Sequence, residues 1–246
     1  PSAIWQQDLG RGGQAFIASG IGAAVQRMSF LDGGAILATS IAGRSIILDA
    51  QSGHAVRRLG ASGALDTQVF PSGDRVATLD QEEVAVWDAT SGELLHRFQV
   101  RHHRQLRVLA DGERLVTGIS GAMHTSIVVW RIADGAAVQL LRQPNDTAWS
   151  LEVSPCGAKV VAGGCRGVAV WSTASGVLEH FWPVQLSRGV KMAVARGGDE
   201  VVVGSLGGVI MRDLRTGRAC WQKMAGTDLV GQLALTDGGL VVAFTQ

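Results

Sequence analysis

Hydrophobic residues along this chain form short stretches rather than long ones. They alternate with polar residues or run for four to six positions, as in "AKVVAGG" and "RLVTGI", and Val, Ile and Leu dominate these stretches. This spacing is typical of β-strands, because a half-buried strand alternates with period two and a fully buried one is a short apolar run. No segment of twelve or more residues shows a helical period, so the pattern predicts an all-β chain.

One stretch of the pattern occurs twice. "VAVWDATSGELL" spans Val84 to Leu95, and "VAVWSTASGVLE" spans Val168 to Glu179. Equivalent positions recur at steps of 43, 39, 43, 41 and 41 residues, and a glycine follows each of them after five residues. The repeated marker positions are Trp5, Leu48, Trp87, Trp130, Trp171 and Arg212, and the glycines are Gly10, Gly53, Gly92, Gly135, Gly176 and Gly217. Glycine adopts positive φ without steric cost, so each glycine predicts a hairpin turn.

A second turn glycine precedes each marker by one strand, as in "FPSGDRVA" and "SPCGAKVV". Each unit of about 41 residues therefore reads as four short strands, which we name a to d. Units of this length and composition are typical of the blades of a β-propeller. We expect residues 1–246 to form a single six-bladed propeller domain of four-stranded antiparallel blades.

The sixth blade is expected to be composite. The last residues, "QLALTDGGLVVAFTQ", supply strands a and b, and the first, "SAIWQQDLGRGGQAFIA", supply strands c and d. Pairing of the strand near Val241 with the strand near Ile4 would close the ring and remove two exposed sheet edges. A fragment of a larger propeller remains the alternative.

Charge and composition limit the classes of partner that we expect the chain to bind. The net charge is +1 and no apolar run approaches the roughly 20 residues that span a bilayer, so we expect neither nucleic-acid binding nor membrane insertion. The three cysteines, Cys156, Cys165 and Cys220, form no CxxC motif and are not expected to pair. Cysteines that are not expected to form disulfides favour a reducing, intracellular environment, and we expect the cytoplasm.

The fourth unit, "LLRQPNDTAWSLEVSPCGAKVVAGGCRGVAVWSTASG", resembles the WD40 repeat family, and the Trp-Asp pair itself is present at Trp87-Asp88. The resemblance implies a β-propeller that docks other proteins. Two features of the family are missing: no unit has its Gly-His pair, and the b–c turns, such as "QEE" and "CRG", lack its Asp. We therefore expect apolar packing to hold the blades together. The unit "IMRDLRTGRACW" also resembles the repeats of quinoprotein-type propellers, where a Trp ends strand d.

The strongest candidate for partner binding is a basic d–a loop, which should lie on the face that also carries the b–c loops. Arg101, His102, His103 and Arg104 are consecutive there, and guanidinium groups pair bidentately with carboxylates or phosphates. The alternative is a solvated loop without a partner. Metal binding by His102 and His103 is disfavoured because no carboxylate or cysteine lies nearby in sequence.

The tryptophans divide into two groups. Trp5, Trp87, Trp130 and Trp171 recur at blade spacing and are expected in the core. Trp149 lies within a strand pattern, which favours packing between blades. Trp182 precedes Pro183 in a longer loop and is expected to be a partly exposed contact residue, together with Arg188 in the same loop.

We therefore expect a non-catalytic scaffold that binds other proteins, as a subunit of a larger complex or through an acidic segment of a partner. No catalytic residues, cofactor or metal are expected. The alternative is a metal-dependent hydrolase or lyase with Asp66, Asp146 and Asp228 around a channel mouth. Such aspartates more commonly form turns and cap loops.

Overall fold

The structure is a computed structural model that describes most of the chain. Residues 4–6, 16–18, 25–31, 35–40, 45–60, 63–119, 126–142, 148–164, 166–183, 190–205, 208–224, 230–235 and 241–245 are described. The chain divides into two compact units, residues 1–108 with 132–135 and residues 109–131 with 136–246, and each is considered by itself. No helix long and apolar enough to cross a membrane occurs among the described residues.

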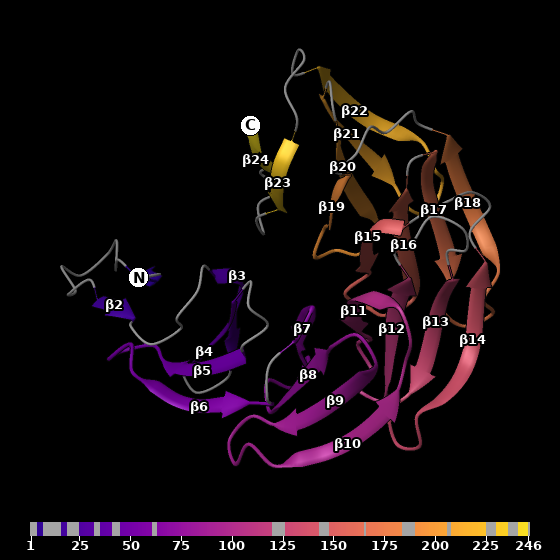
Figure 1. Cartoon of the computed structure of the whole chain (residues 1–246). Coiled ribbons are helices and arrows are strands. Elements are labelled where there is room, and N and C mark those ends of the chain that lie inside the picture. The colour runs from indigo at the N-terminus through magenta and orange to yellow at the C-terminus, as the bar shows by residue number, and fades with distance from the viewer. Residues whose placement is uncertain are drawn as a thin grey trace. The chain divides into compact units, whose positions relative to one another are not determined.

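The described elements are all β-strands, and twenty of them form five four-stranded antiparallel sheets (Figure 1). The sheets contain, in order, β3 (Val25–Leu31), β4 (Ala35–Ser40), β5 (Ser45–Asp49) and β6 (Ala55–Leu59); β7 (Asp66–Val69), β8 (Arg75–Leu79), β9 (Glu83–Asp88) and β10 (Leu94–Gln99); β11 (His103–Val108), β12 (Arg114–Ile119), β13 (Ser126–Arg131) and β14 (Ala136–Arg142); β15 (Ala148–Val153), β16 (Lys159–Gly164), β17 (Gly167–Ser172) and β18 (Leu178–Pro183); and β19 (Lys191–Val194), β20 (Glu200–Ser205), β21 (Gly208–Asp213) and β22 (Ala219–Met224). Each sheet follows the a-to-d order of one sequence repeat, so the predicted four-stranded antiparallel units are confirmed for five of the six repeats.

The two ends of the chain each form a two-stranded sheet. β1 (Ile4–Gln6) pairs antiparallel with β2 (Phe16–Ala18), and β23 (Val230–Leu235) pairs antiparallel with β24 (Val241–Thr245). These pairs are the half-blades c–d and a–b that the repeat predicts. The all-β sheets are consistent with a β-propeller, whereas the joining of the two pairs into a sixth blade, and with it one closed domain over residues 1–246, stays a prediction.

The turns between strands c and d contain the predicted glycines in a left-handed conformation. In the c–d turns, φ is between 66° and 74° at Gly53, Gly92, Gly135, Gly176 and Gly217. At Gly92, for example, the backbone N–H donates to the carbonyl of Asp88 at 2.9 Å. An L-residue with a side chain rarely adopts this left-handed conformation, which explains why glycine recurs at this position.

An aspartate at the end of strand c caps three of these turns. The Oδ1 atom of Asp88 accepts hydrogen bonds from the backbone N–H groups of Thr90, at 2.9 Å, and Ser91, at 2.6 Å. Asp49 and Asp213 accept the equivalent bonds. The hydrogen bonds from Ser91 are the main cause that lowers the pKa of Asp88 below its ordinary value. The Asp of the Trp-Asp pair therefore serves the turn that follows it.

Apolar side chains of neighbouring sheets pack against one another within each unit. In the second unit, strands β12–β14 and β15–β17 share a core that includes Val116, Ile127, Leu151 and Trp171. In the first unit, Leu37 and Ile47 pack with Val76 of the next sheet. Burial of these faces removes apolar surface from water and is the main force that holds adjacent sheets together.

The marker tryptophans lie on strand c as predicted, but they differ in burial. Trp171 is only 1% exposed. Trp87 and Trp130 are half-buried, and their Nε1–H groups donate to the Oγ1 atoms of Thr78, at 2.9 Å, and Thr117, at 2.7 Å. Ala162 occupies the equivalent position of strand b beside Trp171. The prediction of core packing is confirmed for Trp171 and only partly right for Trp87 and Trp130. The side chain of Trp5 lies outside the described residues.

The capping aspartates predict a defined response to acid. Because the folded-state pKa of Asp88 lies below its unfolded value, its stabilisation is present above about pH 4 and is lost as pH falls through the folded pKa. Asp88→Ala is expected to lower the free energy of unfolding at neutral pH, and this deficit should shrink on acidification. Urea titrations at a series of pH values measure both effects. Glu93→Ala, on the same hairpin, is the control, and a deficit that does not change with pH would contradict the capping role.

Candidate functional site

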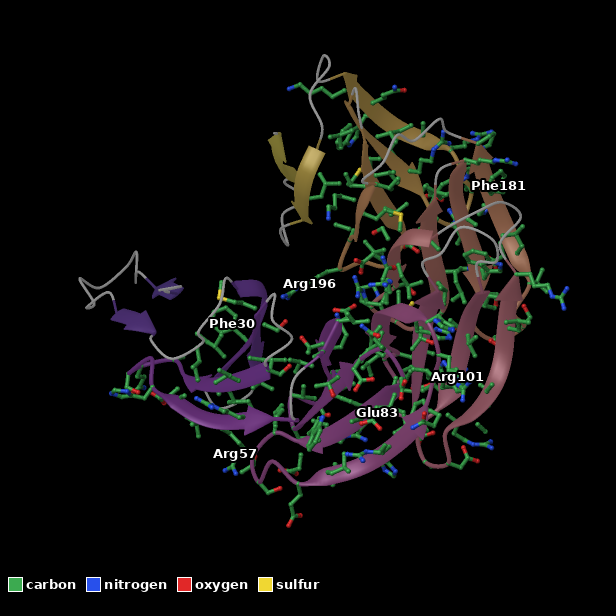
Figure 2. All side chains as sticks on the ribbon, viewed as in Figure 1. Phe30, Arg57, Glu83, Arg101, Phe181 and Arg196 are labelled. Atoms are coloured by element: carbon green, nitrogen blue, oxygen red, sulfur yellow. The ribbon has the colours of Figure 1, made fainter. Side chains whose placement is uncertain are left out.

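A pocket of about 320 Å³ opens where the b–c turn and the d–a loop of the β7–β10 sheet meet. Its walls come from the turn between β8 and β9, from the loop between β10 and β11, and from the residue that precedes β7. Figure 2 labels Glu83 and Arg101, which mark this end of the sheet. The lining residues are Leu65, Gln81, Glu82, Gln99, Arg101, His102, His103 and Arg104. The predicted sharing of one face by b–c and d–a loops is confirmed for this sheet.

The turn that forms one wall is held by a side chain. The Oδ1 atom of Asp80 accepts hydrogen bonds from the backbone N–H groups of Glu82 and Glu83, both at 2.8 Å. The expectation that this b–c turn lacks an aspartate was therefore wrong, since Asp80 begins the turn directly after β8. An aspartate that bonds to backbone N–H groups two and three residues later fixes the shape of a turn.

The facing loop is tied to this turn through the backbone. Val100 N–H donates to the carbonyl of Glu82 at 2.7 Å, and His102 N–H donates to the carbonyl of Gln81 at 3.4 Å. These bonds continue the β9–β10 pairing beyond the ends of both strands. Both walls of the pocket are thus ordered before any ligand binds, which lowers the entropic cost of binding.

His102 has an unusual backbone conformation. Its φ is 63°, and no other non-glycine residue among those described has a positive φ. Histidine tolerates this region better than most residues, but the conformation still carries strain. It turns the chain sharply between Arg101 and His103, so that consecutive side chains of the loop point in different directions.

The sharp turn separates the four residues predicted to project together. Arg101, His102 and Arg104 are exposed at the pocket, whereas His103 is only 4% exposed at the start of β11. The expectation that His103 projects with its neighbours was wrong, because β11 begins at this residue and turns the side chain inward. Arg188, the other arginine predicted to bind a partner, lies outside the described residues.

The arginines at the pocket are available to a ligand. In the part of the chain that the structure describes, neither Arg101 nor Arg104 forms an ion pair. The remaining ionised residue of the lining is Glu82, so the walls carry a net charge of +1 when the imidazoles are neutral. By contrast, a second hollow, of about 480 Å³ at the a–b and c–d turns, is lined by Asp49 and Asp74. The basic pocket can therefore attract an anion, and the second hollow cannot.

Asp66, the first residue of the metal site considered above, has a different role. It is 7% exposed, and its Oδ2 atom accepts hydrogen bonds from Leu106 N–H at 3.0 Å and from Arg107 Nη1 at 3.1 Å. This buried ion pair joins β7 to β11, the first strands of neighbouring sheets. Asp146 and Asp228 lie outside the described residues, and no group of three metal-ligating side chains occurs among those that are described.

Trp182 lies in the core rather than at the surface. It belongs to β18, is 7% exposed and packs with Val168, Val190 and Val203. The guanidinium carbon of Arg212 lies 5.2 Å from the centroid of its ring, which is a cation–π contact. The prediction of a contact residue in a loop was wrong because β18 extends through Pro183 and carries Trp182 inward.

The exposed tryptophan on strand d is Trp221, in β22, at 39% exposure. Alignment on the turn glycine separates the positions of the two tryptophans. The position six residues after this glycine is buried at Leu59, Leu141 and Trp182, half-buried at Phe98 and exposed at Lys223. The position four residues after it carries Trp221 in one sheet and a polar side chain in the other four, namely Arg57, His96, Gln139 and His180.

The described cysteines suggest no chemistry. Cys156 lies in an a–b turn, Cys220 lies on β22, and both are exposed and free. A hydrogen bond with the Ser154 hydroxyl is the largest cause that lowers the pKa of the Cys156 thiol. Cys165 lies outside the described residues.

The repeats can be compared with those of known proteins. Residues 2–223 match the family described as "Outer membrane protein assembly factor BamB". The chain belongs to this family. Its repeats are of a β-propeller type, in agreement with the sheets described above. The resemblance to quinoprotein-type repeats at β21 and β22 thus pointed to the same class of repeat.

A second similarity is to a WD repeat-containing protein. The chain is 27% identical over 136 residues to an uncharacterized WD repeat-containing protein of Synechocystis sp.. The match covers 54% of this chain and 38% of that protein. The chain therefore spans well under half the length of this relative, and WD40 as the specific repeat type stays an interpretation.

The two tryptophans of strand d are expected to respond differently to truncation. Trp182→Ala should lower the free energy of unfolding by about 3–5 kcal/mol because it leaves a large cavity in a packed core. Trp221→Ala should cost under about 1 kcal/mol, since its side chain is partly solvated. Chemical denaturation of both variants measures the difference. Equal costs would contradict the burial of Trp182 that the structure shows.

The buried ion pair allows a second stability prediction. Arg107→Ala is expected to lower the free energy of unfolding by about 3–5 kcal/mol, because it leaves the Asp66 carboxylate buried without its charge partner. Adding Asp66→Asn to this variant should restore part of the loss by removing the buried charge. A double-mutant cycle from denaturation curves tests this, and purely additive effects would contradict direct coupling.

Proposed function

We propose that this chain is a non-catalytic docking module that binds partner proteins through the b–c and d–a loops at one end of its sheets. The observation that carries the proposal is the ordered pocket with two exposed arginines, Arg101 and Arg104, that form no ion pair with any described residue. The partner segment it fits best is acidic. Guanidinium groups bond strongly to carboxylates, and opposite charges also speed the encounter of two proteins.

The comparisons support a role in binding other proteins. The family description names an assembly factor, which is a protein that acts by contacting other proteins. The Synechocystis relative carries WD repeats, and the repeats of this class commonly present loops to partners. The proposed partner is thus another protein, and the chain would act as a subunit of a larger complex. The intracellular location expected from the cysteines stays a prediction.

The ion pair between Asp66 and Arg107 argues against the alternative function, a metal-dependent hydrolase or lyase that would use Asp66 as a metal ligand. A carboxylate that already pairs with a buried guanidinium is poorly placed to bind a cation, because the positive charge repels the metal. Asp66 is therefore assigned to the packing of β7 against β11. No described observation favours a hydrolase or lyase, so the docking function is proposed alone.

Replacing Arg101 and Arg104 together by Ala tests the docking function. The fold should be unchanged, because exposed charges contribute little to stability. Affinity for a fluorescein-labelled peptide of alternating Glu and Ser residues should fall about fivefold or more at low salt, and its salt dependence should flatten. Fluorescence anisotropy across a salt series measures both effects.

The matched control removes two arginines elsewhere. Arg58, on β6, and Arg218, in the c–d turn of the last four-stranded sheet, are exposed and lie outside the pocket. The double variant Arg58→Ala, Arg218→Ala has the same net charge as the test variant. If the affinity for the peptide falls by the same factor in both double variants, the attraction comes from overall charge and the proposed binding face is wrong.

A further inference from the structure

We infer that the pocket selects a singly charged carboxylate of the partner segment over a phosphate group. This inference rests on the proposed docking function and specifies what the pocket recognises. The two anions are chemically close, since arginine forks bind both, so the choice between them depends on the other residues of the walls. Those walls contain a carboxylate of their own, that of Glu82.

The charge balance of the pocket favours a monoanion. Arg101 and Arg104 supply two positive charges and Glu82 supplies one negative charge. A carboxylate brings the total to neutrality, whereas a phosphorylated side chain carries between −1.5 and −2 charges and leaves the site negative. Within a pocket that is partly shielded from water, the repulsion between Glu82 and a second negative charge is stronger than on an open surface.

The backbone of Glu82 is fixed beside the pocket. Its N–H donates to Asp80 Oδ1 and its carbonyl accepts from Val100 N–H, so its Cα cannot move away from the pocket without breaking these bonds. Glu82 forms no ion pair with any described residue. Among the described residues, no ion pair therefore offsets the effect of its charge on an anion that enters.

The neutral part of the walls suits a carboxylate on an aliphatic stem. Gln81 and Gln99 offer amide N–H donors, and Leu65 offers an apolar contact. A volume of about 320 Å³ lies at the lower end of the range for small-ligand sites. The pocket thus fits one acidic side chain together with the residue next to it.

Three labelled peptides that differ at one position test this selectivity. The varied residue is Glu, phosphoserine or Gln, within an otherwise identical Gly-Ser-Leu sequence. Wild-type protein is expected to bind the Glu peptide about threefold or more tightly than the phosphoserine peptide, and the Gln peptide most weakly. Anisotropy titrations at low salt and neutral pH give the three affinities.

The variant Glu82→Gln is the decisive measurement. It removes the repelling charge with little change in shape, so the affinity for the phosphoserine peptide should rise several-fold more than the affinity for the Glu peptide. Glu93→Gln, at the opposite end of the same sheet, is the control and should leave the ratio of the two affinities unchanged.

The outcomes separate this inference from the docking function. If the phosphoserine peptide binds wild type as well as the Glu peptide does, or if Glu82→Gln leaves the ratio unchanged, selectivity for a carboxylate is overturned while docking stands. If the Glu peptide binds no better than the Gln peptide, the pocket does not recognise an anion and both proposals fail.

Discussion

The left-handed turn between strands c and d is the constraint on which the rest of each sheet depends. The glycine of this turn donates its N–H to the last residue of strand c, and in three sheets an aspartate caps the same turn. Together these bonds set the register of strand d against strand c. Because side chains alternate between faces, a shift of one residue would move every apolar side chain of strand d away from its neighbours.

Position along strand d, rather than the face of the strand, decides how the tryptophans are used. Trp182 lies six residues after its turn glycine and packs inward, and Trp221 lies four residues after its own and is partly exposed. At the marker position of β21 an arginine replaces the tryptophan, and its guanidinium lies over the ring of Trp182. The same core is thus completed by different side chains in different sheets, because packing requires volume and contact rather than one residue type.

The candidate site lies beside the buried Asp66–Arg107 ion pair. Leu65, which lines the pocket, precedes Asp66, and Arg104, on the opposite wall, lies three residues before Arg107. The Asp66–Arg107 ion pair therefore holds β7, which follows Leu65, beside β11, which carries Arg104. A buried pair of this kind adds little net stability, but it fixes the relative position of the strands, because separating the charges is costly. Loops held in this way can present a binding surface while the scaffold stays rigid.

The sequence by itself determined the strands, their grouping in fours and the turns that join them, because these follow from local spacing and from glycine's backbone freedom. It also indicated the basic loop of Arg101 and Arg104. It did not determine that His103 faces inward, that Trp182 is buried, or that Asp66 pairs with Arg107, 41 residues away. Burial and pairing are decided by which strand of the next sheet lies opposite each side chain. Only the tertiary structure brings those distant strands together.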